Sequence, residues 1–264
     1  MDRKFLMVLL RKNFLLLFLY FANLFIAPSA WSATLNIDQT KVRLSLEPGQ
    51  AHSGVIEVEN PTTSDVIVKA YAEDWVYSLA HDGSKDFYPV GSMPRSASRW
   101  ISFVPSDFIV PALSKQRVNY TVKVPPDSEG VHVTVLFFES SIGGGVQQGT
   151  GMNVMLRIGS LFYIDTAGKT SRQASFDKFA IAQKPKEMTF TVSFEMKNTG
   201  TQDITTEGLF HIMDGRGMVY SRGKFNNAYT LPGDIVALSA VSNEPLKPGT
   251  YDLVMTFDLG KAQM

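Results

Sequence analysis

The sequence predicts an all-β protein made of two tandem antiparallel β-sandwiches that follow an N-terminal export signal. Three observations predict this organisation. Apolar and polar residues alternate with a period of two in several runs, turn-forming residues separate these runs, and a basic segment followed by an apolar one opens the chain. A period of two places one set of side chains on the core face of a strand and the other set in solvent. No run combines helical periodicity with helix caps, so we expect strands throughout.

The first 33 residues have the layout of a secretory signal peptide. Basic residues at positions 3, 4, 11 and 12 precede an apolar run of 14 residues from Phe14 to Ala27. This length suits a signal peptide and is shorter than the roughly 20 residues that span a bilayer. Small residues around Ser32 and Ala33 suit a cleavage site. We therefore expect removal of residues 1–33, no remaining membrane span and a periplasmic mature protein. The alternative is an uncleaved anchor.

The composition argues against several classes of protein. Loss of four basic residues and one acidic residue with the signal leaves 21 of 25 basic and 24 of 25 acidic residues, a net charge of −3. Binding to nucleic acid needs a clustered positive excess, so we expect no nucleic-acid partner. The chain contains no cysteine. Exported domains often rely on disulfides, so apolar cores must hold this one together.

Alternating runs and turns recur along the rest of the chain. In residues 117–124, 188–197 and 251–257, every second residue is Val, Phe, Met, Leu or Tyr. Turn-forming pairs such as Asn60-Pro61 and Pro248-Gly249 stand between such runs. Short strands separated by turns of this kind predict antiparallel sandwiches.

A small polar segment at residues 165–171 divides the chain. It follows a strand that ends at Tyr163-Ile164. We expect residues 34–165 to form the first sandwich and residues 170–264 the second. Each part has roughly 100–130 residues, which is enough for a core of its own.

The sequence offers no catalytic site. The four histidines are far apart, and none lies in a spacing that favours a metal or a nucleophile–base pair. We therefore expect no enzyme activity, no metal and no cofactor. Trp75 and Trp100 flank a polar loop and could stack on a sugar, although tryptophans in sandwiches are more often core residues.

The last strand of the first domain is the best candidate for a binding site. Met152, Val154, Leu156 and Ile158 alternate there, after a glycine-rich segment. At a sheet edge, this strand would offer unpaired backbone groups to a partner strand. Each large apolar side chain is worth roughly 1.5–3 kcal/mol when fully buried. Alternation by itself favours the alternative of an ordinary core-facing strand.

Five segments of the first domain resemble, in the same order, the motifs of one known family. They are Asp38-Gln39-Thr40-Lys41, Val58-Glu59-Asn60-Pro61, residues 105–118, residues 125–130 and Leu161-Phe162-Tyr163. The family is that of the periplasmic chaperones of the chaperone–usher pilus pathway, whose PapD-like fold has two immunoglobulin-like domains. The resemblance covers most of residues 36–164. It implies two tandem immunoglobulin-like antiparallel β-sandwich domains after the signal peptide.

The resemblance also implies a binding site. In this family, an Arg and a Lys in a cleft between the domains anchor the C-terminal carboxylate of a pilus subunit, and the last strand of the first domain donates apolar residues to the incomplete fold of the subunit. Lys41 stands at the position of the Arg. The expected Lys falls on Ile158, and the neighbouring Arg157 is one residue away and so on the opposite face. The predicted partner-binding residues are therefore Lys41, Met152, Val154, Leu156, Arg157 and Ile158.

Three functions remain open from the sequence. The first is a chaperone or assembly factor that binds exported subunits by strand addition. The second is a structural or adaptor protein of the cell envelope, because Leu46-Glu47-Pro48-Gly49 and residues 124–130 resemble the WxL-interacting surface proteins. The third and weakest is a carbohydrate-binding module that uses the loop tryptophans.

Overall fold

The computed structural model describes residues 35–142, 154–166, 168, 170–184, 189–244 and 246–260. The predicted signal peptide lies outside this part of the chain. Leu35–Met264 forms one compact unit. None of the described residues belongs to a helix with the length and hydrophobicity that a membrane crossing requires.

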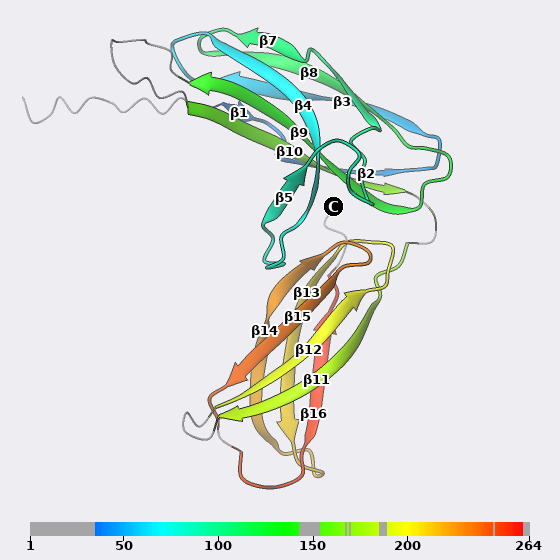
Figure 1. Cartoon of the computed structure of the whole chain (residues 1–264), viewed down its shortest axis with the longest axis vertical. Helices are drawn as coiled ribbons and strands as arrows, with labels where there is room; N and C mark the ends of the chain where they lie inside the picture. The colour runs from blue at the N-terminus through cyan, green and yellow to red at the C-terminus, as the bar shows by residue number, and fades with distance from the viewer. Residues whose placement is uncertain are drawn as a thin grey trace, which may run out of the picture. The chain divides into compact units, whose positions relative to one another are not determined.

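The first ten strands form two sheets that pack face to face (Figure 1). One sheet has the order β1 (Asn36–Ile37), β3 (Ala51–Asn60), β8 (Ser114–Lys123) and β6 (Ile101–Val104). The other has the order β2 (Lys41–Leu46), β10 (Val154–Thr166), β9 (Gly130–Ile142), β4 (Val66–Tyr77) and β5 (Lys85–Tyr88), and β7 (Asp107–Val110) also pairs with β4. Of these strand pairs, only β2 with β10 is parallel.

The last six strands form a second pair of sheets. One sheet has the order β11 (Ala174–Lys184), β12 (Thr189–Asn198) and β15 (Ile235–Ser242), and the other has the order β14 (Val219–Thr230), β13 (Ile204–Met213) and β16 (Asp252–Asp258). All their pairs are antiparallel. The prediction of two tandem immunoglobulin-like β-sandwiches is confirmed. The domain division at residues 165–170 stays a prediction, although no described ladder joins the first ten strands to the last six.

The alternating residues build the cores. In β8, Val118, Tyr120 and Val122 face the first core and are at most 4% exposed. In β12, Phe190, Val192, Phe194 and Met196 face the second core and are at most 3% exposed. β16 has the same alternation, but its inward residues Leu253, Met255 and Phe257 are only half-buried. The period-two signal therefore identified the core faces of these strands correctly.

Two buried asparagines hold corresponding turns in the two sandwiches. Asn60 donates to the carbonyls of Ser64, Val110 and Pro111, and its oxygen accepts from Thr62. Asn198, the last residue of β12, is buried in the same way and donates to the carbonyl of Gln202. These side chains satisfy backbone groups that the turns leave unpaired.

Trp75 belongs to the interior of the first sandwich. It is fully buried, and its indole N–H donates to the carbonyl of Thr134 at 3.1 Å. Trp100 is half-buried and packs against the first core. Trp75 therefore offers no face for a sugar to stack on.

His132 in β9 makes the stability of the first sandwich depend on pH. Its ring lies 4.3 Å from that of Trp100, and burial, with a smaller contribution from the charge of Arg95, lowers its pKa from about 6.5 to about 4. Between these two values the unfolded chain binds more protons than the folded one, so stability falls as the pH falls through this window. We predict that His132→Phe, which keeps an aromatic ring that cannot be protonated, reduces this loss of stability between pH 7 and pH 4, as measured by urea unfolding. An unchanged pH dependence would contradict the assignment.

Candidate protein-binding site

Strand β10 changes its neighbours halfway along its length. It pairs with β9 throughout, but its other edge pairs with β2 only from Leu161 to Thr166. Along residues 154–160, no described strand pairs with that other edge. Backbone N–H and C=O groups that point away from β9 are therefore available there to a further strand. We call residues 154–160 the open half of β10.

The two faces of the open half differ. Leu156 and Ile158 are half-buried and pack against the first core. Met155, on the other face, is 54% exposed. The predicted apolar residues thus give part of their surface to their own sandwich and leave the rest accessible at the sheet edge.

Strand β2 begins where the open half ends. Leu161 pairs with Lys41, and its N–H donates to the carbonyl of Thr40 at 3.0 Å. Beyond this point β2 occupies the edge of β10. A strand added along the open half would therefore end next to Lys41.

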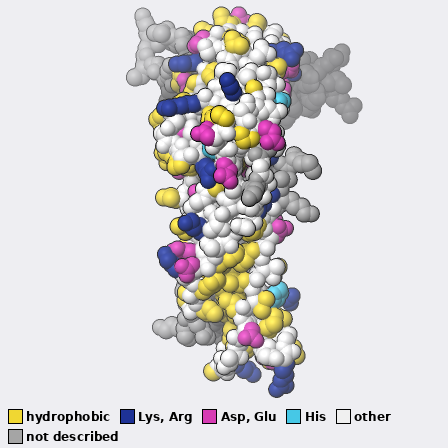
Figure 2. All heavy atoms as spheres, turned by 90° about the vertical axis from the view of Figure 1, so that its right-hand side faces the viewer, with side chains coloured by type: hydrophobic (Ala, Val, Ile, Leu, Met, Phe, Trp, Pro, Cys, Tyr) yellow, Lys and Arg dark blue, Asp and Glu magenta, His cyan; other side chains and the backbone are white. Residues whose placement is uncertain are grey.

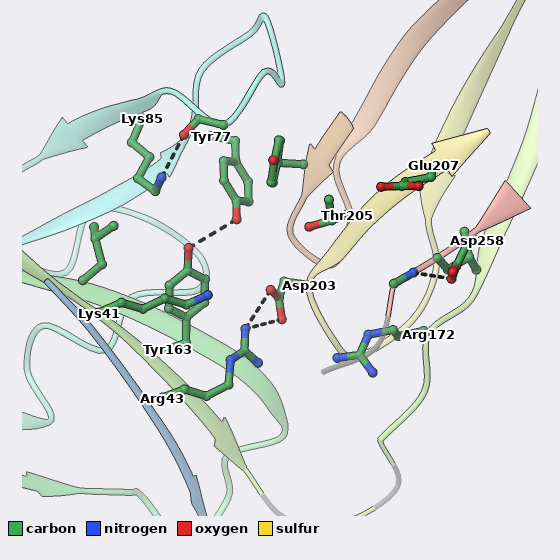
Figure 3. Close-up of a pocket in the computed structure, with 15 residues that line it drawn as sticks. Lys41, Arg43, Tyr77, Lys85, Tyr163, Arg172, Asp203, Thr205, Glu207 and Asp258 are labelled. Carbon is green, nitrogen blue, oxygen red and sulfur yellow. Dashed lines mark hydrogen bonds and ion pairs between the residues drawn. The ribbon is translucent and has the colours of Figure 1, made fainter. Parts of the chain in front are cut away.

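Lys41 lines a cavity of about 540 Å³ (Figure 3). The cavity is lined by residues of β2, β10 and the β4–β5 hairpin together with residues after position 170. The basic side chains from the first sandwich are Lys41, Arg43 and Lys85, and the acidic side chains from the second are Asp203, Glu207 and Asp258. The charged side chains that the first sandwich gives to the cavity are therefore all basic, whereas Arg172 accompanies the three acidic side chains from the rest of the chain.

Lys41 and Lys85 lie over aromatic rings. The Nζ of Lys41 is 4.9 Å from the ring centre of Tyr163, and the Nζ of Lys85 is 5.3 Å from that of Tyr77 and 5.4 Å from that of Trp75. Burial lowers the pKa of Lys85, and the positive charge of Lys41 lowers it further. Two cations that repel each other in a partly desolvated cavity favour the binding of an anion between them.

Arg43 holds the cavity together as an ion-pair clamp. Its two terminal nitrogens lie 2.8 Å from a carboxylate oxygen of Asp165 and 2.7 Å from one of Asp203. Burial would lower the pKa of Arg43, but the hydrogen bonds and charges of the two carboxylates outweigh it and raise that pKa. Burial raises the pKa of Asp165, and the charge of Asp203 adds to this effect. Without the guanidinium, two carboxylates with little solvent exposure would face each other.

Comparison with solved structures identifies the fold. No family model matches the sequence, and no curated protein is significantly similar to it. A chain of the chaperone–tip adhesin complex of CFA/I fimbriae biogenesis is similar over 84% of this chain and 98% of its own, with a TM-score of 0.50 and 10% identity. The chain has the PapD-like fold of pilus chaperones.

Two other chaperone structures match at lower scores. The class 5 fimbriae chaperone CfaA matches over 84% of this chain and 98% of its own, with a TM-score of 0.48 and 11% identity. A chain of the CsuC–CsuE chaperone–adhesion subunit complex of Acinetobacter baumannii has the same coverage, a TM-score of 0.45 and 12% identity.

The PapD-like fold places the predicted site residues in different surroundings. Lys41 lies in the cavity, and Val154, Leu156 and Ile158 lie on the open half of β10. Met152 lies outside the described residues.

Arg157 does not line the cavity. Its guanidinium lies 4.0 Å from the ring centre of Phe137 and forms an ion pair of 3.3 Å with Glu73. Both contacts are on the outer face of the sheet, as expected for a residue one position away from the inward-facing Leu156 and Ile158. The structure therefore does not bring Arg157 and Lys41 together.

Among the basic cavity residues of the first sandwich, sequence reasoning missed Arg43 and Lys85. Arg43 could have been found, because it follows Lys41 by two residues and a strand places such residues on the same face. Lys85 stands in a short hairpin, where its Nζ donates to the carbonyl of Gly83 at 2.8 Å. Its proximity to Lys41 is a long-range consequence of the sheet order, which no local pattern indicates.

We predict that Arg43→Met destabilises the protein by about 3 kcal/mol, because it leaves two poorly solvated carboxylates without their cation. The loss should shrink as the pH falls, since protonation of the raised-pKa Asp165 relieves the repulsion. Urea unfolding at several pH values measures both effects. Lys115→Met is the control, because Lys115 makes only long ion pairs of 3.8–3.9 Å at an exposed position and should contribute less than about 1 kcal/mol. Equal losses of unfolding free energy in Arg43→Met and Lys115→Met would contradict the stabilising role of the Arg43 ion pairs.

Proposed function

We propose that the protein is a non-enzymatic periplasmic chaperone for subunits of a pilus or another surface structure. In this proposal, an extended segment of the subunit adds to the open half of β10, and the C-terminal carboxylate of the subunit binds near Lys41 and Lys85. The observation that carries the proposal is the continuity of the two features, since the open half leads directly to Lys41. The PapD-like fold supports the same function, because similar structures are chaperone complexes with adhesin or pilin subunits.

The charges of the cavity define the direction of the added strand. β2 runs parallel to β10 and begins at Lys41. A subunit strand that also runs parallel to β10 would bring its carboxyl end to Lys41. An antiparallel strand would bring an amino end there instead, and its positive charge would be repelled. The lysines therefore favour parallel addition of a C-terminal segment.

The open half supplies the remaining binding energy. Main-chain hydrogen bonds give affinity in strand addition, and alternate side chains give specificity. Leu156 and Ile158 are only half-buried in their own sandwich, so an added strand would bury apolar surface that is accessible in the free protein.

This function predicts two separable losses of binding. Co-expression with the candidate subunits encoded by neighbouring genes should give a soluble one-to-one complex. Val154→Asp combined with Leu156→Asp should abolish the complex, because it places charges in the added sheet. Lys41→Gln and Lys85→Gln should each weaken binding by about tenfold, which corresponds to about 1.4 kcal/mol, and should have little effect on a subunit that ends in an amide.

The control for the edge variant is Ile67→Asp. Ile67 is 74% exposed on β4 of the same sheet, away from β10, and its substitution should leave binding unchanged. Urea unfolding confirms that each variant is folded. Retained binding in the edge variant would rule out strand addition along β10. A protein that stays with the envelope fraction and forms no subunit complex would favour the structural or adaptor alternative.

A further inference from the structure

The second sandwich is closed along one side and open along the other. Where β14 and β15 meet, the edge strands of the two sheets contact each other. On the opposite side, β11 pairs only with β12 and β16 pairs only with β13, as far as the described residues show. Figure 1 shows β11 and β16 next to each other at the right of this sandwich. Both present an unpaired backbone edge.

An apolar groove of about 390 Å³ lies between these two edges. Its lining includes Phe179 and Ile181 of β11, Val192 of β12, and Leu253 and Met255 of β16. Figure 2, which faces this side of the molecule, shows hydrophobic side chains gathered along the second sandwich. Phe179 is 54% exposed and Ile181 is 57% exposed.

These side chains belong to the core face, not to the outer surface. Ile181 pairs with Val192, which is 1% exposed, and Met255 pairs with Phe210, which is fully buried. Directly paired residues share one face of a sheet. Ile181 and Met255 therefore point into the sandwich and still remain accessible. A core face that is exposed at the edge of a sandwich lacks the strand that would cover it.

The groove is closed at one end. There the rings of Phe176 and Phe257 stack with their centres 4.8 Å apart. Towards the other end, a β-bulge at residues 178–179 interrupts the pairing of β11 with β12. Phe179 lies in this bulge and lines the groove. The opening is thus bounded by two strand edges and one aromatic stack.

The chain itself carries a strand that suits this groove. Among the described strands, the open half of β10, residues 154–160, is an unpaired strand edge, and so is the outer edge of β16. The open half presents unpaired backbone groups and carries apolar residues at every second position. It therefore offers the hydrogen-bonding edge and the side-chain pattern that the groove lacks.

We propose that the open half of β10 in one molecule adds to β16 of a second copy and covers its groove. The contact is heterologous, because the donor edge and the acceptor groove are different surfaces. Heterologous contacts give rings or open chains of molecules. The inference uses the same β10 edge as the proposed function, so a bound subunit and a second copy exclude each other. Self-association would cover two unpaired sheet edges that otherwise promote aggregation.

Sedimentation velocity of the purified protein over a range of concentrations tests the proposal. The wild type should associate increasingly with concentration. Ile181→Asp, in the groove, and Leu156→Asp, in the open half, should each weaken self-association by more than about tenfold. An equimolar mixture of these two variants should form dimers and nothing larger, because only one donor edge and one intact groove remain. Ile235→Asp is the control, since Ile235 is 55% exposed on β15, away from the groove.

Cross-linking provides a second measurement that does not depend on the charged variants folding. The chain has no cysteine, so introduced thiols are the only ones present. Met155→Cys mixed with Val254→Cys or Thr256→Cys of β16 should give an intermolecular disulfide. Met155→Cys mixed with Val219→Cys should not, because Val219 lies on β14, at the opposite edge of the same sheet.

The outcomes separate this inference from the proposed function. A protein that is monomeric at all concentrations, or that cross-links equally through β14 and β16, overturns the inference, even if it binds a subunit. Self-association that Ile181→Asp leaves unchanged overturns it as well. Self-association through the groove without any subunit complex supports the inference and contradicts the chaperone role.

Discussion

The parallel pairing of β2 with the second half of β10 is the constraint on which the site depends. It closes one edge of β10 from Leu161 onwards and leaves residues 154–160 open. The same register brings Lys41 to the end of the open half and Arg43 next to Asp165. A shift of one residue would turn both basic side chains to the other face of the sheet. One register therefore sets the binding edge, the cation at its end and the ion-pair clamp.

The cores of the two sandwiches are built from strands with the same period-two pattern, but their strand edges are covered to different extents. In the first, the edge of β10 is partly covered by β2, and its apolar residues are half-buried. In the second, the core faces of β11 and β16 remain accessible at their edges, as the exposure of Ile181 shows. Both features are unpaired strand edges beside apolar side chains. This shared chemistry links the proposed binding of subunits to the proposed self-association.

Much of the fold could be predicted from the sequence, but only part of the site. Period-two alternation identified the strands and their core faces, because the side-chain direction in a strand is a local property. The ordered motifs of the first domain led to the PapD-like fold and to Lys41. The position of Lys85 beside Lys41 and the ion pairs of Arg43 depend on how strands that are distant in the sequence are ordered in the sheets. Local sequence patterns carry no information about that order. Trp75 flanks a polar loop in the sequence, where a core position was the favoured interpretation, and the structure confirms that it is buried.

Hydrogen–deuterium exchange along β10 is the most direct test of the central claim. In the free protein, amides of residues 154–160 that point away from β9 should exchange quickly, and those of residues 161–166 should be protected by β2 and β9. Binding of a subunit should protect the open half and leave residues 161–166 unchanged. Full protection of residues 154–160 in the free, monomeric protein, or no change on binding, would contradict the account.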